Sequence, residues 1–397
     1  IVGVGAGIAS ILGKNGSEFI SQQYNAVTPG NEMKPDAILG STIGKLVKPT
    51  DEVSADKTDF ITVEDAKSMG YIIPDNYTSY DDNRFKSATG EYAVPRLNFD
   101  NVDKLMKAAH ENGVKLRGHT LVWHQQTPKY FFQQNYKITT GQKYNTSKEC
   151  MDTRLEFYVK TVMNHVLSSE YADCLYSYDV VNEYLHSANA EKDSKNITYW
   201  GLIYGTYDKS VKDHGVTLRP SYVKDAFKYA HEMLVKYDRL DVKLIYNDYN
   251  CYQNPENIIH LVDYINSDGK VCDGIGMQSH LDITDSFHSA TNYAKALEYF
   301  RLNCPDLEIQ ITELDATMVS TEDKPLTDED QAAYYDQIMN AILTNKKNGG
   351  NITALIIWSL YDGVSWRPAK FPCLFNGLYM PKAAFYAVID AKKQYWD

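Results

Sequence analysis

The sequence predicts an α/β protein built as a closed barrel of eight parallel strands, and three observations support this fold class. Eight short apolar segments recur along the 397 residues. Amphipathic helical patterns separate these segments from one another. Most of the segments are apolar on both faces, which is typical of parallel strands covered by helices. Strict alternation over this length favours a (β/α)8 or TIM barrel, and we expect a single domain over residues 1–397.

The predicted strands are four to ten residues long and most are rich in branched or aromatic side chains. They are Val2–Gly5, Tyr24–Thr28, Val114–Trp123, Leu175–Asn182, Val242–Tyr246, Gly274–Ser279, Leu307–Thr312 and Ile352–Trp358.

The helical patterns between the strands are equally regular. Apolar side chains over residues 155–166 recur at i, i+3, i+4, i+7, i+8 and i+11, and similar stripes cover 102–109 and 258–265. A further helix is predicted to begin at Thr327 with Asp330, because a threonine followed by an acidic residue three positions later forms a helix cap.

Residues 37–95 interrupt the alternation of predicted strands and helices. They are polar, rich in aspartate and without a clear period, so we expect an irregular insertion that elaborates the loop after the second strand. The alternative fold is a doubly wound open sheet. That fold would favour a GxGxxG turn after the first strand, and residues 3–7 lack this spacing.

Composition excludes several function classes. The net charge of −12 without a basic cluster argues against nucleic acid as a partner, and no apolar segment is long enough to span a membrane. The six cysteines show no CxxC pair or metal-finger spacing, so we expect neither a structural zinc site nor a dense disulfide framework. The 31 tyrosines and 5 tryptophans supply flat amphipathic rings, which suit sugar ligands.

Polar side chains follow seven of the eight predicted strands. In barrels of this type, functional groups come from the carboxyl ends of the strands, so these side chains are expected to meet at one face. In chain order they are Asn31, Glu32, Lys34, His119, Trp123, His124, Gln126, Asn182, Glu183, Tyr246, Asn247, Asp248, Gln278, His280, Glu313, Asp315, Trp358, Asp362 and Trp366.

Two glutamates stand out within this set. Glu183 and Glu313 follow different strands, and two carboxyl groups at one site can act as proton donor and nucleophile, as glycosidic bond cleavage requires. Asp315 is expected to orient and charge His280, which would keep Glu313 ionised. Taken alone, each carboxylate fits a capped, solvated or salt-bridged group better than a catalytic one.

Six motifs in order resemble glycoside hydrolase family 10, the endo-β-1,4-xylanases, over nearly the whole chain. They are TPGNEMK at Thr28–Lys34, RGHTLVWH at Arg117–His124 with Gln126, DVVNE at Asp179–Glu183, YNDYN at Tyr246–Asn250, GIGMQSH at Gly274–His280 and ITELD at Ile311–Asp315.

The resemblance implies a retaining double displacement, with Glu183 as acid/base and Glu313 as nucleophile, and with the two carboxyl groups ~5 to 5.5 Å apart. His280 and Asp315 would orient the nucleophile. The residues implied to bind substrate are Asn31, Lys34, His119, Trp123, Gln126, Asn182, Tyr246, Gln278, Trp358 and Trp366. The implied substrate is xylan with xylo-oligosaccharides. The implied protein is a secreted or cell-surface monomer, with carbohydrate-binding modules elsewhere in its precursor and no cofactor.

The chain departs from the family motif at two positions, and the sequence leaves three alternative functions open. Gly30 stands where the family usually has glutamate and Pro35 where it usually has tryptophan, so contacts to remote sugars on the non-reducing side are expected to be weaker or rearranged. The alternatives are a retaining hydrolase of β-glucan or mannan, a metal-dependent hydrolase using His119 and His280, and a polysaccharide-binding protein without activity.

Overall fold

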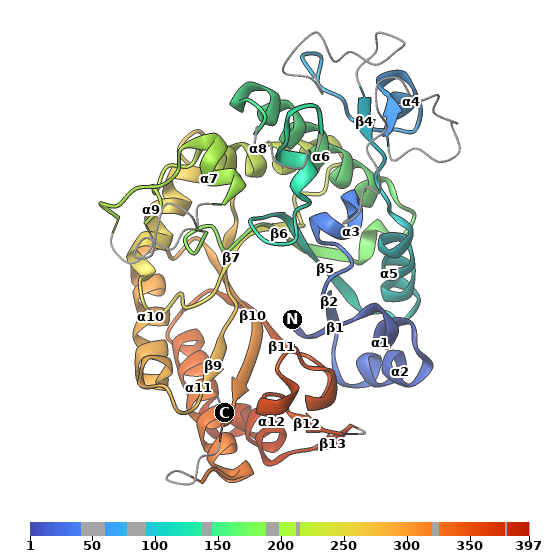
Figure 1. The fold of residues 1–397 in the computed structure, drawn as a ribbon. Helices are drawn as coiled ribbons and strands as arrows, with labels where there is room; N and C mark the ends of the chain where they lie inside the picture. The colour runs from blue at the N-terminus through green and yellow to red at the C-terminus, as the bar shows by residue number, and fades with distance from the viewer. Residues whose placement is uncertain are drawn as a thin grey trace.

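The computed structural model contains a closed barrel of eight parallel strands, so the predicted fold class is confirmed (Figure 1). The structure describes residues 1–40, 60–77, 93–136, 145–187, 198–211, 215–319, 325–377 and 379–396. The barrel strands are β1 Val2–Ala6, β2 Ala26–Pro29, β5 Lys115–Trp123, β6 Leu175–Asn182, β7 Lys243–Asp248, β8 Gly274–Met277, β10 Glu308–Thr317 and β11 Ile352–Trp358.

The barrel closes between its first and last strands. β1 pairs in parallel with both β2 and β11, and β11 pairs in turn with β10, so every barrel strand has two neighbours. A short strand, β9 (His280–Asp282), adds to the far end of β10, where His280 lies opposite Asp315 in register. Closure brings the carboxyl ends of all eight strands to one face of the barrel.

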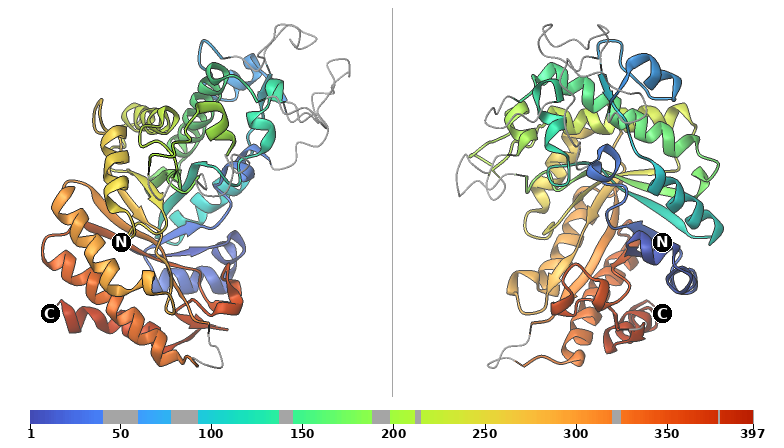
Figure 2. Two further views of the ribbon diagram at one scale, coloured as in Figure 1. Left: turned by 60° about the vertical axis from the view of Figure 1, so that its left-hand side comes forward. Right: turned by 45° about the vertical axis from the view of Figure 1, so that its right-hand side comes forward.

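Helices surround the barrel as an outer ring (Figure 1, Figure 2). Their bounds are α1 Ile8–Leu12, α2 Lys14–Gln23, α3 Pro35–Leu39, α5 Asp100–Glu111, α6 Lys148–Ser168, α7 Tyr199–Tyr204, α8 Ser221–Lys236, α9 Pro255–Ile265, α10 Ala290–Asn303, α11 Asp328–Lys347 and α12 Ala383–Tyr395. The predicted cap of α11 is present, since Thr327 and Asp330 each bond the other's backbone N–H. A two-stranded pair, β12 Phe375–Asn376 with β13 Met380–Pro381, precedes α12.

The predicted insertion at 37–95 contains regular structure in its described part. β3 (Phe60–Thr62) pairs antiparallel with β4 (Ala93–Pro95), and α4 (Val63–Ser68) follows β3 directly. These elements lie at the outer edge of the molecule, where residues 70–72 bond to side chains of α6 (Figure 2). Residues 41–59 and 78–92 of the predicted insertion lie outside the described ranges.

The barrel interior carries polar groups below the strand ends. Arg117 is fully buried and donates to the Asp179 carboxylate and to Gln310 across the barrel. Gly5 of β1 leaves room for an aromatic ring, because a Cβ there would lie 2.3 Å from Cε3 of Trp358. The interior is therefore shaped by close contacts that fix side chains at the carboxyl end.

The cysteines form no disulfide bond in the structure. All six are free, and five of them are buried. Within the described ranges, no helix is both long enough and apolar enough to cross a membrane.

Candidate active site

Glu313 lies on β10 and is held as a carboxylate. Its Oε2 is 3.1 Å from Nε2 of His280, and its Oε1 accepts a hydrogen bond of 2.9 Å from Nδ2 of Asn247. Burial raises the pKa of Glu313, but the bond from His280 and the charges of His119 and His280 outweigh burial and lower the pKa to about 2. Glu313 is therefore ionised over nearly the whole pH range and can act as a nucleophile.

His280 is charged because acidic groups lie on both sides of its ring. Its Nδ1 is 3.0 Å from Oδ1 of Asp315, with which it forms an ion pair. Burial lowers the pKa of His280, but Asp315 and Glu313 outweigh burial and raise it to about 10. Trp366 fixes the other Asp315 oxygen with a bond of 2.7 Å from its Nε1. The predicted chain from Asp315 through His280 to Glu313 is present in the structure.

Glu183 follows β6, and its pKa is shifted upward, in the opposite direction to that of Glu313. Its Oε2 accepts a bond of 2.8 Å from Nε1 of Trp123, and its Oε1 accepts one of 2.9 Å from Nε2 of Gln278. Burial raises the pKa of Glu183, these bonds lower it and the charges of Asp248 and Glu313 raise it, so that the pKa lies above its ordinary value. Glu183 is thus suited to hold a proton beside a carboxylate that has none.

The backbone of Glu183 also departs from the strand. Its φ of +58° lies in the left-handed region that non-glycine residues seldom adopt, while its N–H donates to the carbonyl of Asn247 at 2.8 Å. Such a conformation persists only where surrounding contacts fix it, and it ends β6 so that the carboxyl group faces its neighbours from the next strands.

Three amide side chains connect the two glutamates. Asn182 Oδ1 accepts bonds from Asn247 at 2.9 Å and from Gln278 at 3.1 Å, and each of these donors also bonds one glutamate. Asn182 and Asn247 are register partners on β6 and β7, so the barrel fixes this bridge directly. The bridge keeps the two carboxyl groups in one rigid hydrogen-bonded unit.

The remaining predicted sugar contacts lie around this unit. Lys34 donates to Asn31 Oδ1 at 3.2 Å and lies over the Trp123 ring at 4.9 Å. Gln126 also donates to Asn31, at 3.4 Å. His119 bonds Asp179 through Nδ1 at 2.9 Å, and its ring meets Trp358 edge to face.

Tyr246 is a correction to the predicted set of sugar contacts. Its side chain is fully buried, and its hydroxyl donates to Asp248 and accepts the Leu185 N–H at 3.1 Å. Tyr246 therefore supports Asp248 from within the barrel and has no surface for a sugar. Its neighbour Asn247, noted only as a strand-end residue, carries the contact to Glu313 because side chains alternate along a strand.

The metal-dependent alternative has no ligand set in the described part of the chain, where no three His, Cys, Asp or Glu side chains are arranged to hold an ion. His280 contacts two carboxylates, and His119 contacts Asp179.

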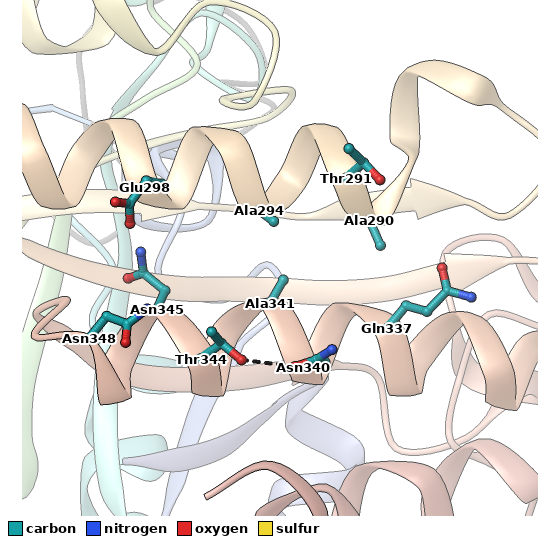
Figure 3. A pocket seen from close by; sticks show the side chains of 10 residues that line it. All are labelled: Ala290, Thr291, Ala294, Glu298, Gln337, Asn340, Ala341, Thr344, Asn345 and Asn348. Carbon is teal, nitrogen blue, oxygen red and sulfur yellow. Dashed lines mark hydrogen bonds between the residues drawn. The ribbon is translucent and has the colours of Figure 1, made fainter.

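A cavity of about 440 Å³ lies elsewhere, between α10 and α11 on the outer ring (Figure 3). Its walls are mainly amides, hydroxyls and alanines, including Asn345, Gln337 and Ala294. None of the residues that line it belongs to the strand-end set, so it is separate from the paired glutamates.

A barrel whose strand ends carry two glutamates joined by amides, one with a lowered pKa and one with a raised pKa, is typical of a glycoside hydrolase. Comparison with known proteins identifies the family of glycoside hydrolases to which the chain belongs. The model of glycosyl hydrolase family 10 matches residues 2–391, and the chain belongs to this family.

Three relatives illustrate the similarity. Endo-1,4-beta-xylanase A of Butyrivibrio fibrisolvens is 40% identical over 94% of this chain and 77% of its own length. The bifunctional endo-1,4-beta-xylanase XylA of Ruminococcus flavefaciens is 30% identical over 96% of this chain, which spans only 32% of that protein. A solved structure of Clostridium thermocellum xylanase 10B, with CBM22-1 and GH10 modules and bound xylohexaose, has a TM-score of 0.70 and 27% identity over 98% of this chain and 64% of that one.

Proposed function

We propose that this chain hydrolyses internal β-1,4-xylosidic bonds in xylan and xylo-oligosaccharides by a retaining double displacement. The opposite proton affinities of Glu183 and Glu313 carry this proposal, because the reaction needs one protonated and one ionised carboxyl group at the same time. The endo-1,4-beta-xylanase names of the similar proteins support the substrate class.

In the first step, the Glu313 carboxylate attacks the anomeric carbon of the xylose on the non-reducing side of the bond. The bond from that carbon to the glycosidic oxygen breaks, and the oxygen takes the proton of Glu183. A covalent ester between Glu313 and the sugar remains. His280 and Asn247 hold the attacking carboxylate in position from its two oxygens.

In the second step, Glu183 is ionised and acts as a base. It removes a proton from water as the water oxygen attacks the anomeric carbon, and the ester bond to Glu313 breaks. Glu183 then regains its proton and Glu313 its negative charge. Two inversions at one carbon give a product with the original configuration.

The stereochemistry of the first product tests substrate, linkage and mechanism together. NMR of xylohexaose digests is expected to show the β-anomer before mutarotation, with release of internal fragments. Early α-product would contradict the mechanism. Turnover of lichenan, cellulose or mannan without turnover of xylan would favour the alternative substrates, and loss of activity on chelation with recovery on adding zinc would favour the metal-dependent alternative.

Substitution of the two glutamates separates their roles. Glu313→Ala is expected to lower kcat by roughly 10⁴-fold or more while xylohexaose still binds, because only the covalent step is lost. Glu183→Gln is expected to release about one equivalent of nitrophenol rapidly from an activated aryl β-xyloside and then to turn over slowly, since a good leaving group needs no proton.

Pre-steady-state absorbance and calorimetric binding measure these effects. Undiminished hydrolysis by Glu313→Ala would overturn the assignment of the nucleophile. A wild-type protein that binds xylohexaose without cleaving it would support the polysaccharide-binding alternative.

We also propose a secreted or cell-surface monomer, because polymeric xylan is too large to reach an enzyme inside the cell. Fractionation of the source cells and sedimentation of the purified chain test the location and the oligomeric state. Xylanase activity confined to the cell interior, or a dimer at low concentration, would contradict this proposal.

A further inference from the structure

A histidine–aspartate pair that the double displacement does not use lies beside the acid/base. His186 follows Glu183 by three residues, and its Nδ1 is 2.7 Å from Oδ1 of Asp248 at the end of β7. The Asp248 side chain is almost completely buried, and that of His186 is 18% exposed. A buried carboxylate and a nearly buried imidazole in contact form an ion pair whose net charge depends on pH.

Several contacts fix the geometry of this pair. Tyr246 donates its hydroxyl to Oδ2 of Asp248, and the Tyr249 N–H donates to Oδ1 at 2.8 Å. The Tyr249 ring stacks on His186 with centroids 3.8 Å apart. The carboxylate therefore cannot turn away from Glu183 when the charge of His186 changes.

The charges of the pair act on Glu183 and on each other. Burial raises the pKa of Glu183, and Asp248 adds to this as the strongest nearby negative charge. Burial lowers the pKa of His186, but Asp248 outweighs burial and Glu183 adds to the effect, so the pKa of His186 is raised. His186 thus exchanges its proton above its ordinary range.

Two other titratable groups around His186 and Asp248 keep the same charge as the pH rises through the alkaline range. His124 at the end of β5 faces His186 and Asp248, and burial lowers its pKa to about 4, so it is neutral at higher pH. Burial raises the pKa of Tyr249, which keeps its hydroxyl neutral. Lys34 and Glu313 approach Glu183 from other elements, and substitution of His186 or Asp248 leaves both of these side chains in place.

We infer that His186 and Asp248 form a titratable charge pair that sets the alkaline limit of the reaction, which makes both of them positioning residues for Glu183. This inference rests on the proposed function. Loss of the Asp248 charge makes Glu183 release its proton at lower pH. Loss of the His186 charge leaves Asp248 unbalanced, so that Glu183 keeps its proton to higher pH.

Two substitutions of similar shape test these opposite signs. Asp248→Asn is expected to move the alkaline limb of kcat/KM to lower pH, and His186→Asn to higher pH, each by roughly half to one pH unit. The asparagine amide nitrogen at position 186 can replace Nδ1 as the donor to Asp248 without its charge. His110→Asn is the matched control, because His110 pairs with Asp173 at 2.9 Å on the outside of the barrel and should leave the limb unchanged.

Limbs that shift in the same direction, or that stay within error of the wild type in folded variants, would overturn the inference. A second measurement does not depend on activity. The imidazole of His186, followed by NMR in the wild type and in Asp248→Asn, is expected to titrate at least half a pH unit lower without the carboxylate.

An unchanged midpoint would also overturn the inference. A wild-type protein without glycosidase activity but with the expected NMR shift would overturn the proposed function and the alkaline-limit role, while showing that the charge pair exists. The two failures are therefore distinguishable.

Discussion

Glu183 and Glu313 are the same amino acid with opposite proton affinities, because different groups surround them. Burial favours the neutral form of both carboxyl groups. Glu313 gains a charged imidazole, whereas Glu183 gains only neutral donors, from Trp123 and Gln278, and lies near two other carboxylates. The assignment of acid and nucleophile thus follows from neighbours that lie more than thirty residues away along the chain.

Removal of the imidazole charge tests this account. His280→Gln can keep a hydrogen bond to Glu313 but not the positive charge, so the pKa of Glu313 is expected to rise from about 2. The acid limb of kcat/KM should then move up by roughly one pH unit or more. Its pH profile is compared with those of the wild type and of His110→Asn, and an acid limb that stays in place would contradict the role of His280.

The pKa shifts of Glu313 and His280 also predict how these two side chains contribute to the free energy of unfolding at different pH. The pKa of Glu313 is lowered on folding, so its contribution is complete above pH 4.5 and is lost as the pH falls towards 2. The pKa of His280 is raised on folding, so its contribution is complete below pH 6.5 and is lost as the pH rises towards 10. Both contributions are complete together only between pH 4.5 and 6.5.

Close packing between elements places the aromatic side chains of the site. Trp358 ends β11 and rests against β1 at Gly5, where any side chain would meet its ring. Trp366 is held by the Asp315 carboxylate, and the Arg367 guanidinium lies 3.8 Å from the centre of its ring. The ring of Trp358 is thus fixed by the backbone of a neighbouring strand.

Gly5→Ala is expected to displace Trp358, because the new Cβ would lie 2.3 Å from a ring carbon. The cost should be roughly 1 to 3 kcal/mol in the free energy of unfolding, with a fall in kcat/KM. Urea unfolding and xylohexaose kinetics measure both effects. Gly7→Ala is the control, since the nearest atom to its Cβ would be 4.0 Å away, and equal effects at the two positions would refute this explanation.

Barrel closure gives β1, the first strand of the chain, a hydrogen-bonded neighbour on each side. β1 pairs on both sides, with β2 and β11, although residues 2 and 358 are nearly the whole chain apart. Opening this seam would leave two strand edges unpaired and expose the interior ion pair of Arg117 and Asp179.

Hydrogen exchange is therefore expected to show that the amides of β1 and β11 exchange only with global unfolding, as slowly as those of β5 and β6. The two-residue pair β12–β13 should exchange faster and acts as an internal comparison. Rapid local exchange in β1 would mean that the seam opens independently of the rest of the barrel.

Hydrophobic period and ordered motifs predicted the eight strands, four of the helices and the family, because both are local properties of the chain. The sequence also predicted that Glu183, Glu313, His280 and Asp315 would meet at the strand ends, where the structure places them. The prediction named Tyr246 as a sugar contact and missed the bond from Asn247 to Glu313, because alternation shows that the two side chains face opposite sides of the strand but not which side holds the nucleophile.

Only the tertiary structure showed that Asn247 bridges to Glu313, that Tyr246 is buried and that His186 pairs with Asp248. These contacts join residues of different strands, and their charges and burial exist only after the barrel closes. The pKa values of Glu183 and Glu313 are therefore a property of the closed barrel, because its geometry decides which charged groups are buried next to each carboxyl group.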